Sequence, residues 1–211
     1  IKKSHILADV LAQFEESSYG LTSVILNAAL CGVPQSRTRF FLIGHLNDKH
    51  NLLKPIFQKN LSEKPMSIRD YLGDTLGLNV YYRHPRNYNR RGIFTIDEPS
   101  PTIRGVNRPI PKGYQLNTCD PAGVNLKKVR PLTTIERSYL QTFPTDFKFS
   151  GTKTNLEQMI GNAVPVNLGT FIAKGIQEYI ENGALKNMQN TFFDESPPFE
   201  LPQRALARIP S

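Results

Sequence analysis

The N-terminal end of the chain carries apolar residues at helical spacing. Ser4 is a typical N-cap residue, and apolar side chains recur behind it until Tyr19-Gly20, where the pattern stops. Because these positions fall on one side of a helix, they predict a surface helix with one buried face. They are Ile6, Leu7, Val10, Leu11 and Phe14.

Two apolar runs with strand character follow. Residues 21–28 and 39–46 are β-like, and Gly32-Val33-Pro34 lies between them as a turn signal. The pattern predicts a strand, a turn and a second strand. Residues 40–44 are nearly continuous in apolar side chains, which is typical of a strand covered on both faces.

From residue 47 to residue 129 the pattern becomes irregular. Short β-like pieces at residues 92–96 and 102–104 are separated by Pro, Gly and Asn, and residues 67–72 favour a short helix. Residues 107–113 contain prolines that cannot donate main-chain hydrogen bonds, so we expect an exposed loop there. Residues 47–129 are therefore predicted to form a second domain or a large insertion, mixed in structure and rich in loops.

Helical signals return in the last third of the chain. Thr133-Thr134-Ile135-Glu136 and Thr154-Asn155-Leu156-Glu157 have the spacing of capping boxes, which predicts two short helices. A longer helix is predicted to begin at Pro165 and to stop at Asn182-Gly183. Beyond it, the polar and proline-bearing residues 184–211 predict a flexible tail. The apolar stripe of the long helix is Leu168, Ile172, Ile176 and Ile180.

Composition limits the class of protein. With 211 residues, 39% hydrophobic and 21% charged, the chain can bury the core of one or two small domains. No segment approaches the roughly 18 uncharged apolar residues of a membrane span. Cys31 and Cys119 give neither a disulfide framework nor a CxxC-type metal site, so we expect a cytoplasmic protein without a metal. The first residue is Ile1 rather than Met, which favours a partial or processed sequence.

Positive charge is concentrated in one part of the middle segment. The chain has a formal net charge of +8. Between residues 83 and 112, seven cationic side chains face only Asp97 and Glu98, and the tyrosines 81, 82 and 88 are interleaved among them. Six of the seven are arginines, which can fork onto a phosphate or a guanine edge. A nucleic acid partner and a plain solvated basic surface both fit this pattern.

One motif begins just before the second predicted strand. Residues 27–39 read Asn-Ala-Ala-Leu-Cys-Gly-Val-Pro-Gln-Ser-Arg-Thr-Arg, and an apolar run ending in Ile43-Gly44 follows. Strand alternation would place Arg37 and Arg39 on the same face, which predicts a paired-cation site. The motif resembles the Gln-x-Arg-x-Arg block of the DNA cytosine-5 methyltransferase family. The resemblance implies that Arg39 donates to a flipped cytosine near O2, that Arg37 orders neighbouring groups, and that Gln35 supports the turn.

Two later motifs resemble further blocks of the same family, in the same order. Residues 130–136, continued by Leu-Gln-Thr-Phe-Pro at 140–144, are similar to the block that braces the recognition domain. Residues 158–165, Gln-Met-Ile-Gly-Asn-Ala-Val-Pro, resemble the last block, which lines the S-adenosylmethionine pocket. A Gly-Asn turn opening a helix would leave free N–H groups for a small polar ligand. The resemblance implies cofactor contacts by Asn162, Ala163 and Val164.

The family places its variable target-recognition domain between the first and second of these blocks. Residues 98–105 resemble the short Thr-plus-aliphatic element of many such domains, and duplex DNA is the implied partner. The DNA-binding residues predicted on this basis are Thr102, Ile103, Arg104, Arg83, Arg86, Arg90, Arg91 and Arg108.

The sequence also lacks parts that the family has. No Phe-x-Gly-x-Gly cofactor loop, Pro-Cys nucleophile or Glu-Asn-Val block occurs in it, and Cys31 is expected to be a buried apolar filler. We therefore predict a chain that is inactive alone, completed by an N-terminal half in the same protein or in a partner subunit. A catalytically inactive DNA-binding protein or regulator is the alternative.

The resemblance implies an α/β fold of two parts, from a bacterial restriction-modification system. The C-terminal part of a Rossmann-like methyltransferase domain would comprise residues 1–46 and 130–183. A smaller, mixed, loop-rich target-recognition domain would comprise residues 47–129, and residues 184–211 would be the tail.

Overall fold

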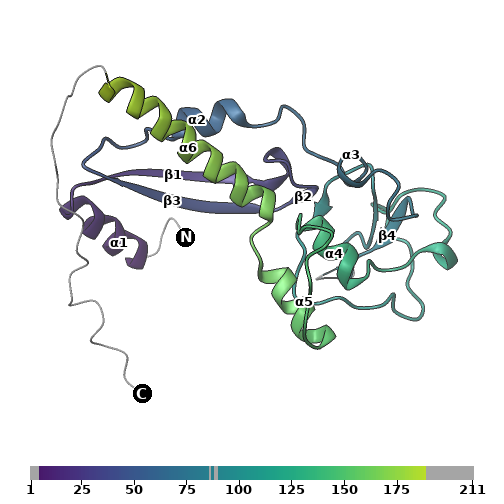
Figure 1. Cartoon of the computed structure of the whole chain (residues 1–211). Helices are drawn as coiled ribbons and strands as arrows, with labels where there is room; N and C mark the ends of the chain where they lie inside the picture. Colours follow the sequence, from purple (N-terminus) through teal and green to yellow (C-terminus); the bar gives the residue numbers. More distant parts are fainter. Residues whose placement is uncertain (1–4, 86, 88–89, 189–211) are drawn as a thin grey trace. The chain divides into compact units, whose positions relative to one another are not determined.

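A computed structural model describes residues 5–85, 87 and 90–188, with side chains up to residue 182 (Figure 1). The chain divides into two units, residues 1–179 and 180–211. The predicted DNA-binding residue Arg86 and most of the predicted tail, residues 189–211, lie outside the described residues. In the described part, no helix has both the length and the apolar character that crossing a membrane requires.

A two-stranded antiparallel ribbon lies at the centre of the first core. Strand β1 (Tyr19–Asn27) pairs with β3 (Thr38–Leu46) along its whole length. The 3-10 helix η1 (Ala28–Leu30) and a turn connect the strands, and Gly32 in that turn has φ +76°, a left-handed conformation that glycine adopts without strain. The predicted sequence of strand, turn and strand is confirmed.

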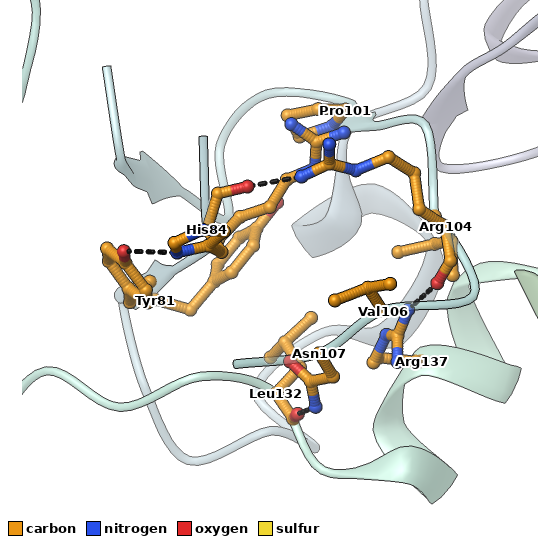
Figure 2. Close-up of a pocket in the computed structure, with 11 residues that line it drawn as sticks. Tyr81, His84, Pro101, Arg104, Val106, Asn107, Leu132 and Arg137 are labelled. Carbon is orange, nitrogen blue, oxygen red and sulfur yellow. Dashed lines mark hydrogen bonds between the residues drawn. The ribbon is translucent and has the colours of Figure 1, made fainter. Parts of the chain in front are cut away.

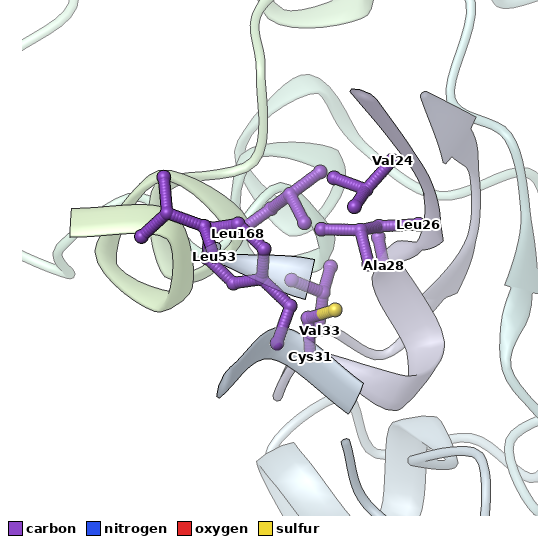
Figure 3. Packing of buried hydrophobic residues seen from close by; sticks show 8 residues of the cluster. Val24, Leu26, Ala28, Cys31, Val33, Leu53 and Leu168 are labelled. Atoms are coloured by element: carbon purple, nitrogen blue, oxygen red, sulfur yellow. The ribbon is translucent and has the colours of Figure 1, made fainter. Parts of the chain in front are cut away.

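Two helices cover one face of this ribbon. Helix α2 (Lys54–Asn60), which the apolar pattern did not predict, and α6 (Val166–Met188) supply Phe57 and Leu168 to a core with side chains of the ribbon and its turn (Figure 3). Gly175 permits the close approach of the two helices, because a Cβ there would lie 2.4 Å from the Phe57 ring. The other members of this core are Val24, Leu26, Ala28, Cys31, Val33 and Leu53.

The other apolar surfaces of the ribbon region are less covered than predicted. No residue of β3 is buried, so the predicted cover on both faces is wrong for this chain. Helix α1 (His5–Glu16) likewise has no buried residue, and Ile6 on it is 75% exposed. The physical reason is that α2 and α6 both pack into the same core, so both cover the same face of the ribbon.

A second core joins the middle of the chain to its later helices. Its residues come from α3 (Ile68–Leu72), β4 (Val80–Tyr82), the 102–104 segment, α4 (Thr134–Leu140) and α5 (Lys153–Asn162). Strand β5 (Ile93–Thr95) pairs with β4, β2 (Gln35–Ser36) pairs in parallel with β6 (Ser100–Pro101), and η2 (Leu126–Lys128) is a further short turn. The core residues are Ile68, Leu76, Tyr81, Ile96, Ile103, Leu132, Leu140 and Ile160.

The helix boundaries differ from the predicted ones in two places. Thr152, not Thr154, caps α5, because its side chain accepts a hydrogen bond from the Asn155 N–H. Helix α6 passes through the predicted stop at Asn182-Gly183 and ends at Met188. The short helix at residues 68–72 and the capping box of Thr133 with Glu136 are confirmed. The β-like piece at residues 102–104 is wrong, since the strand lies just before it at β6.

Candidate functional site

Gln35 and Arg37 hold both main-chain groups of one residue, Ile103. The Ile103 N–H donates to Gln35 Oε1 at 2.9 Å, and Arg37 Nη1 donates to the Ile103 carbonyl at 3.0 Å. The parallel pairing of β2 with β6 brings the two segments together, with Gln35 opposite Ser100. Gln35 and Arg37 are 0% and 3% exposed, so these hydrogen bonds lie in the interior.

The same two side chains also reach the later helices. Gln35 Nε2 donates to the Leu140 carbonyl at 3.2 Å, at the end of α4. Arg37 Nη2 donates to the Gly161 carbonyl at 3.1 Å, near the end of α5. The end of α5 approaches the neighbouring loop so closely that a Cβ on Gly161 would lie 2.2 Å from the Gly105 nitrogen. Gln35 and Arg37 therefore bind three other segments of the chain, which are Ile103, the end of α4 and the end of α5.

Arg37 and Arg39 are close enough for their charges to interact, but they occupy different environments, and the predicted paired-cation site stays a prediction. The chain is not a continuous strand at Arg37, where the main-chain N–H donates to Asn27 Oδ1 at 3.2 Å and the side chain turns inward. Burial and the nearby Arg39 charge lower the pKa of Arg37 to about 10. Arg39 is half-buried at the start of β3, where its Nη1 donates to the Thr38 carbonyl.

A basic cleft of about 730 Å³ lies next to this buried network, because Thr102 and Arg104, on either side of Ile103, line it. The structure brings Arg39 into the cleft together with five of the eight predicted DNA-binding residues. Ile103 instead lies in the core, Arg108 is exposed and is not part of the cleft wall, and Arg86 lies outside the described residues. The cleft is lined by Ser36, Arg39, Arg83, Pro85, Arg90, Arg91, Phe94, Pro99, Pro101, Thr102 and Arg104.

The cations of the cleft differ in how far they are already engaged. Arg91 forms a two-pronged ion pair with Glu98, donates from Nε to the Ile93 carbonyl at 2.8 Å, and lies 4.3 Å from the centroid of the Phe94 ring. Arg91 could bind another anion through these groups only if that pairing opened. Arg90 is exposed, which leaves its guanidinium accessible from solvent.

The wall formed by Thr102–Arg104 is anchored by its own side chains as well. Thr102 Oγ1 donates to the Ser36 carbonyl at 2.9 Å, and Arg83 donates to the Thr102 carbonyl at 2.8 Å. Arg104 donates to the His84 carbonyl. Because each residue of the wall has a hydrogen bond to a different segment, its main chain is held in place before any ligand arrives.

A residue that the sequence reasoning missed lies behind this wall. Arg137 of α4 is buried and donates to the Arg104 carbonyl (Figure 2). It also forms an ion pair with the buried Glu157 of α5. Asn107 donates beside it to the Leu132 carbonyl at 2.7 Å and to Glu157 at 3.3 Å. The spacing of Arg137 with Leu140, on the core side of the same helix, was the available signal.

The predicted cofactor residues lie at the junction of α5 and α6. Asn162 is the last residue of α5 rather than the start of a helix, so the predicted Gly-Asn turn opening a helix is wrong. The N–H of Val166 donates to the Gln141 carbonyl at 3.0 Å, and the N–H of Asn167 donates to Thr142 Oγ1 at 2.9 Å. These two N–H groups of α6 are therefore already satisfied. Among the residues that the junction exposes are Asn162 and the apolar Val164, which is 50% exposed.

The two thiols lie in contrasting surroundings. Cys31 is 5% exposed and packs in the first core, and burial raises its pKa to about 11. It is a protonated core side chain at neutral pH, as the sequence predicted. Cys119 is exposed. Among the described residues, no group of three His, Cys, Asp or Glu side chains is placed to hold a metal ion.

Comparison with curated proteins finds that the chain is similar to Type II methyltransferases. M.HindV of Haemophilus influenzae, a Type II methyltransferase, is 73% identical over 176 residues, covering 83% of this chain and 58% of that protein. M.HgiDI of Herpetosiphon aurantiacus, also a Type II methyltransferase, is 49% identical over 185 residues, covering 88% of this chain and 59% of that protein. The chain thus spans less than two thirds of the length of these relatives.

Solved structures give the fold. The S. pombe Dnmt2 methyltransferase matches with a TM-score of 0.57 at 16% identity, over 86% of this chain and 64% of that one. The Entamoeba histolytica methyltransferase EhMeth matches with a TM-score of 0.52 at 14% identity, over 85% and 60% of the two chains. The predicted α/β methyltransferase fold is confirmed. Since the profile of the C-5 cytosine-specific DNA methylases also matches residues 1–178, the chain belongs to that family.

Proposed function

We propose that this chain supplies the DNA-recognition part, and one part of the active site, of an enzyme that transfers a methyl group from S-adenosylmethionine to C5 of cytosine in a specific double-stranded DNA sequence. The observation that carries the proposal is the shared cleft, in which Arg39 lies with five of the eight predicted DNA-binding residues. Family membership supports the reaction class.

The cleft has the chemistry to hold DNA. Guanidinium groups bind phosphates and the edges of guanine, and a segment with a fixed main chain can present them at defined positions. We assign Arg90 and Arg104 to DNA contacts, and Thr102 to the same wall. In this arrangement Arg39 would donate to a cytosine extruded from the duplex, and its charge would stabilise negative charge that develops on the ring.

The residues at the α5–α6 junction fit one side of the cofactor. An exposed amide on Asn162 offers a donor and an acceptor, and Val164 beside it offers an apolar contact. S-adenosylmethionine supplies the electrophilic methyl group when it is bound. We propose that Asn162, Ala163 and Val164 form part of its pocket wall.

The remaining parts of the active site would come from a region that the chain does not contain. The buried Cys31, with a pKa of about 11, is unsuited to act as a nucleophile at neutral pH. Among the described residues β3 pairs only with β1, and its second edge is available to another strand. We propose that a further part of the same protein, or a partner subunit, pairs there and brings the nucleophile. A bacterial restriction-modification role and a cytoplasmic location belong to this proposal, and M.HindV, to which the chain is similar, is a Type II methyltransferase of a bacterium.

Duplex binding by the purified chain tests the proposal. We expect the chain to bind duplex DNA, with an affinity that falls as salt rises, and to enrich one sequence from a random duplex library. Arg90→Ala should weaken binding, whereas the matched control Lys174→Ala, an exposed cation on α6, should leave it unchanged. A folded chain with no affinity for duplex DNA at low salt would refute the recognition role.

A further inference from the structure

Gln141, at the end of α4, is fully buried and uses both ends of its side-chain amide. Its Oε1 accepts a hydrogen bond from Gln35 Nε2 at 2.9 Å. Its Nε2 donates to the Ile160 carbonyl and, at 3.4 Å, to the Ala163 carbonyl. A glutamine side chain can both accept and donate in this way, which a carboxylate or an apolar side chain cannot.

Gln141 therefore completes a relay of hydrogen bonds between two functional regions. The relay starts at the Ile103 N–H, passes through the Gln35 and Gln141 amides, and ends at carbonyls of the α5–α6 junction. Ile103 lies between Thr102 and Arg104, which line the basic cleft. Ala163 lies in the segment assigned to the cofactor.

The main chain of Gln141 reinforces the same connection. Its carbonyl accepts the Val166 N–H, at the start of α6, at 3.0 Å. The next residue, Thr142, has φ +58°, which is uncommon for a residue other than glycine, and its hydroxyl accepts the Asn167 N–H at 2.9 Å. Gln141 and Thr142 thus hold the end of α5 and the start of α6, while the Gln141 side chain also binds Gln35, which supports the cleft wall.

We propose that Gln141 is a positioning residue: its amide sets the Thr102–Arg104 wall relative to the α5–α6 junction, and thereby determines how sharply the cleft discriminates between DNA sequences. The inference rests on the proposed role of the cleft in DNA recognition. Charge in the cleft supplies attraction to any duplex, while the placement of base-contacting groups determines discrimination. A change at Gln141 should therefore separate these two properties.

The test uses the whole 211-residue chain and the duplex that the wild-type chain enriches from a random library. Gln141→Leu keeps the approximate size but removes both hydrogen-bonding functions, and Gln141→Glu keeps the acceptor for Gln35 but removes the donor. For Gln141→Leu we expect about a tenfold loss in the affinity ratio between the selected duplex and one with a single altered base pair, comparable to the contribution of one base pair. Affinity for unrelated duplex, and its salt dependence, should stay within about twofold of wild type.

Controls distinguish positioning from loss of folding. Gln58→Leu removes an exposed glutamine of α2 and should leave the ratio unchanged. In Gln35→Leu, the further change Gln141→Leu should add little, because the relay is already broken. If Gln141→Leu unfolds the chain, Gln141→Glu is compared instead, with melting followed in parallel.

Each outcome bears on one of the two proposals. A wild-type chain that binds no duplex would contradict the proposed function itself. A wild-type chain that discriminates, together with folded Gln141→Leu or Gln141→Glu variants that discriminate equally well, would overturn the positioning role alone. The positioning role would also fail if the variants lost affinity for the selected duplex and for unrelated duplex by equal factors.

Discussion

The buried network around Ile103 and the adjacent basic cleft are built from residues that are neighbours in sequence but have different roles. Arg37 is 3% exposed and binds two main-chain carbonyls, whereas Arg39, two residues later, lies at the cleft. In the network, hydrogen bonds fix the position of the Thr102–Arg104 wall. In the cleft, arginines line the wall, and Arg90 among them is exposed. The difference indicates that changes in the network should cost stability, whereas loss of an exposed cation of the cleft such as Arg90 should cost affinity and leave stability unchanged.

The largest effect should follow from breaking the buried ion pair of Arg137 with Glu157. Arg137→Met leaves the Glu157 carboxylate buried without its cation, and we expect a loss of about 3–5 kcal/mol in the free energy of unfolding. Urea denaturation measures it. Replacing both residues with Met should be less harmful than the single change, since no unpaired charge is left.

A second ion pair that involves α4 provides the control. Arg130 pairs with Glu136 at 2.6 Å, but the Arg130 side chain is 44% exposed. Arg130→Met should therefore cost no more than about 1 kcal/mol. Equal losses for the Arg130 and Arg137 variants would contradict the distinction between the network and the surface.

The next largest effect is expected at Gly161. A Cβ there would lie 2.2 Å from the Gly105 nitrogen and 2.3 Å from the Arg104 carbonyl carbon, so the main chain itself would have to move. Gly161→Ala should lower the free energy of unfolding by about 1–3 kcal/mol. Gly169→Ala, in α6, meets no atom within 4 Å and should stabilise the helix slightly. A Gly161→Ala variant as stable as wild type would show that the close approach is not needed.

In the cleft, the effect should appear in binding. Arg90→Ala removes one exposed cation, and the slope of log affinity against log salt should fall by about 0.9 for one lost phosphate contact. The free energy of unfolding should change by less than about 0.5 kcal/mol. A loss of stability larger than this, measured by the same urea titration, would place Arg90 in the network rather than in the cleft.

The last prediction concerns the two thiols. Since burial raises the pKa of Cys31 from 9.0 to about 11, its contribution to stability is complete below pH 9 and is lost as the pH rises through about 11. At neutral pH a thiol reagent should label Cys119 rapidly and Cys31 only on unfolding. Rapid labelling of both thiols in the native protein would show that the first core is open.

The fold was predictable where local patterns decide it. The ribbon, the Thr133 capping box and the long helix all follow from residue periodicity and cap chemistry. The exposure of β3 was not predictable, because apolar residues indicate that a strand tends to be buried but do not indicate which other elements are present to cover it. Helix α2 was missed because its seven residues are too few to show a clear period.

The site was predictable as a set of residues and not as an arrangement. The basic segment and Arg39 do share a cleft, yet strand alternation did not predict that Arg37 would be buried at a point where hydrogen bonding to Asn27 interrupts the strand. The individual roles of Gln141 and Arg137 were not predicted, because their partners are 19 to 106 residues distant in sequence. Contacts of that range depend on tertiary packing alone.

Methyl transfer tests the central claim most directly. The chain is joined to the part of M.HindV that it does not cover, and incorporation of tritiated methyl from S-adenosylmethionine into duplex DNA is measured for the joined protein, its Arg39→Ala variant and the chain alone. We predict transfer to C5 of cytosine by the joined protein, most of it lost in Arg39→Ala, and none by the chain alone. Transfer by the chain alone, or full turnover in a folded Arg39→Ala protein, would contradict the account.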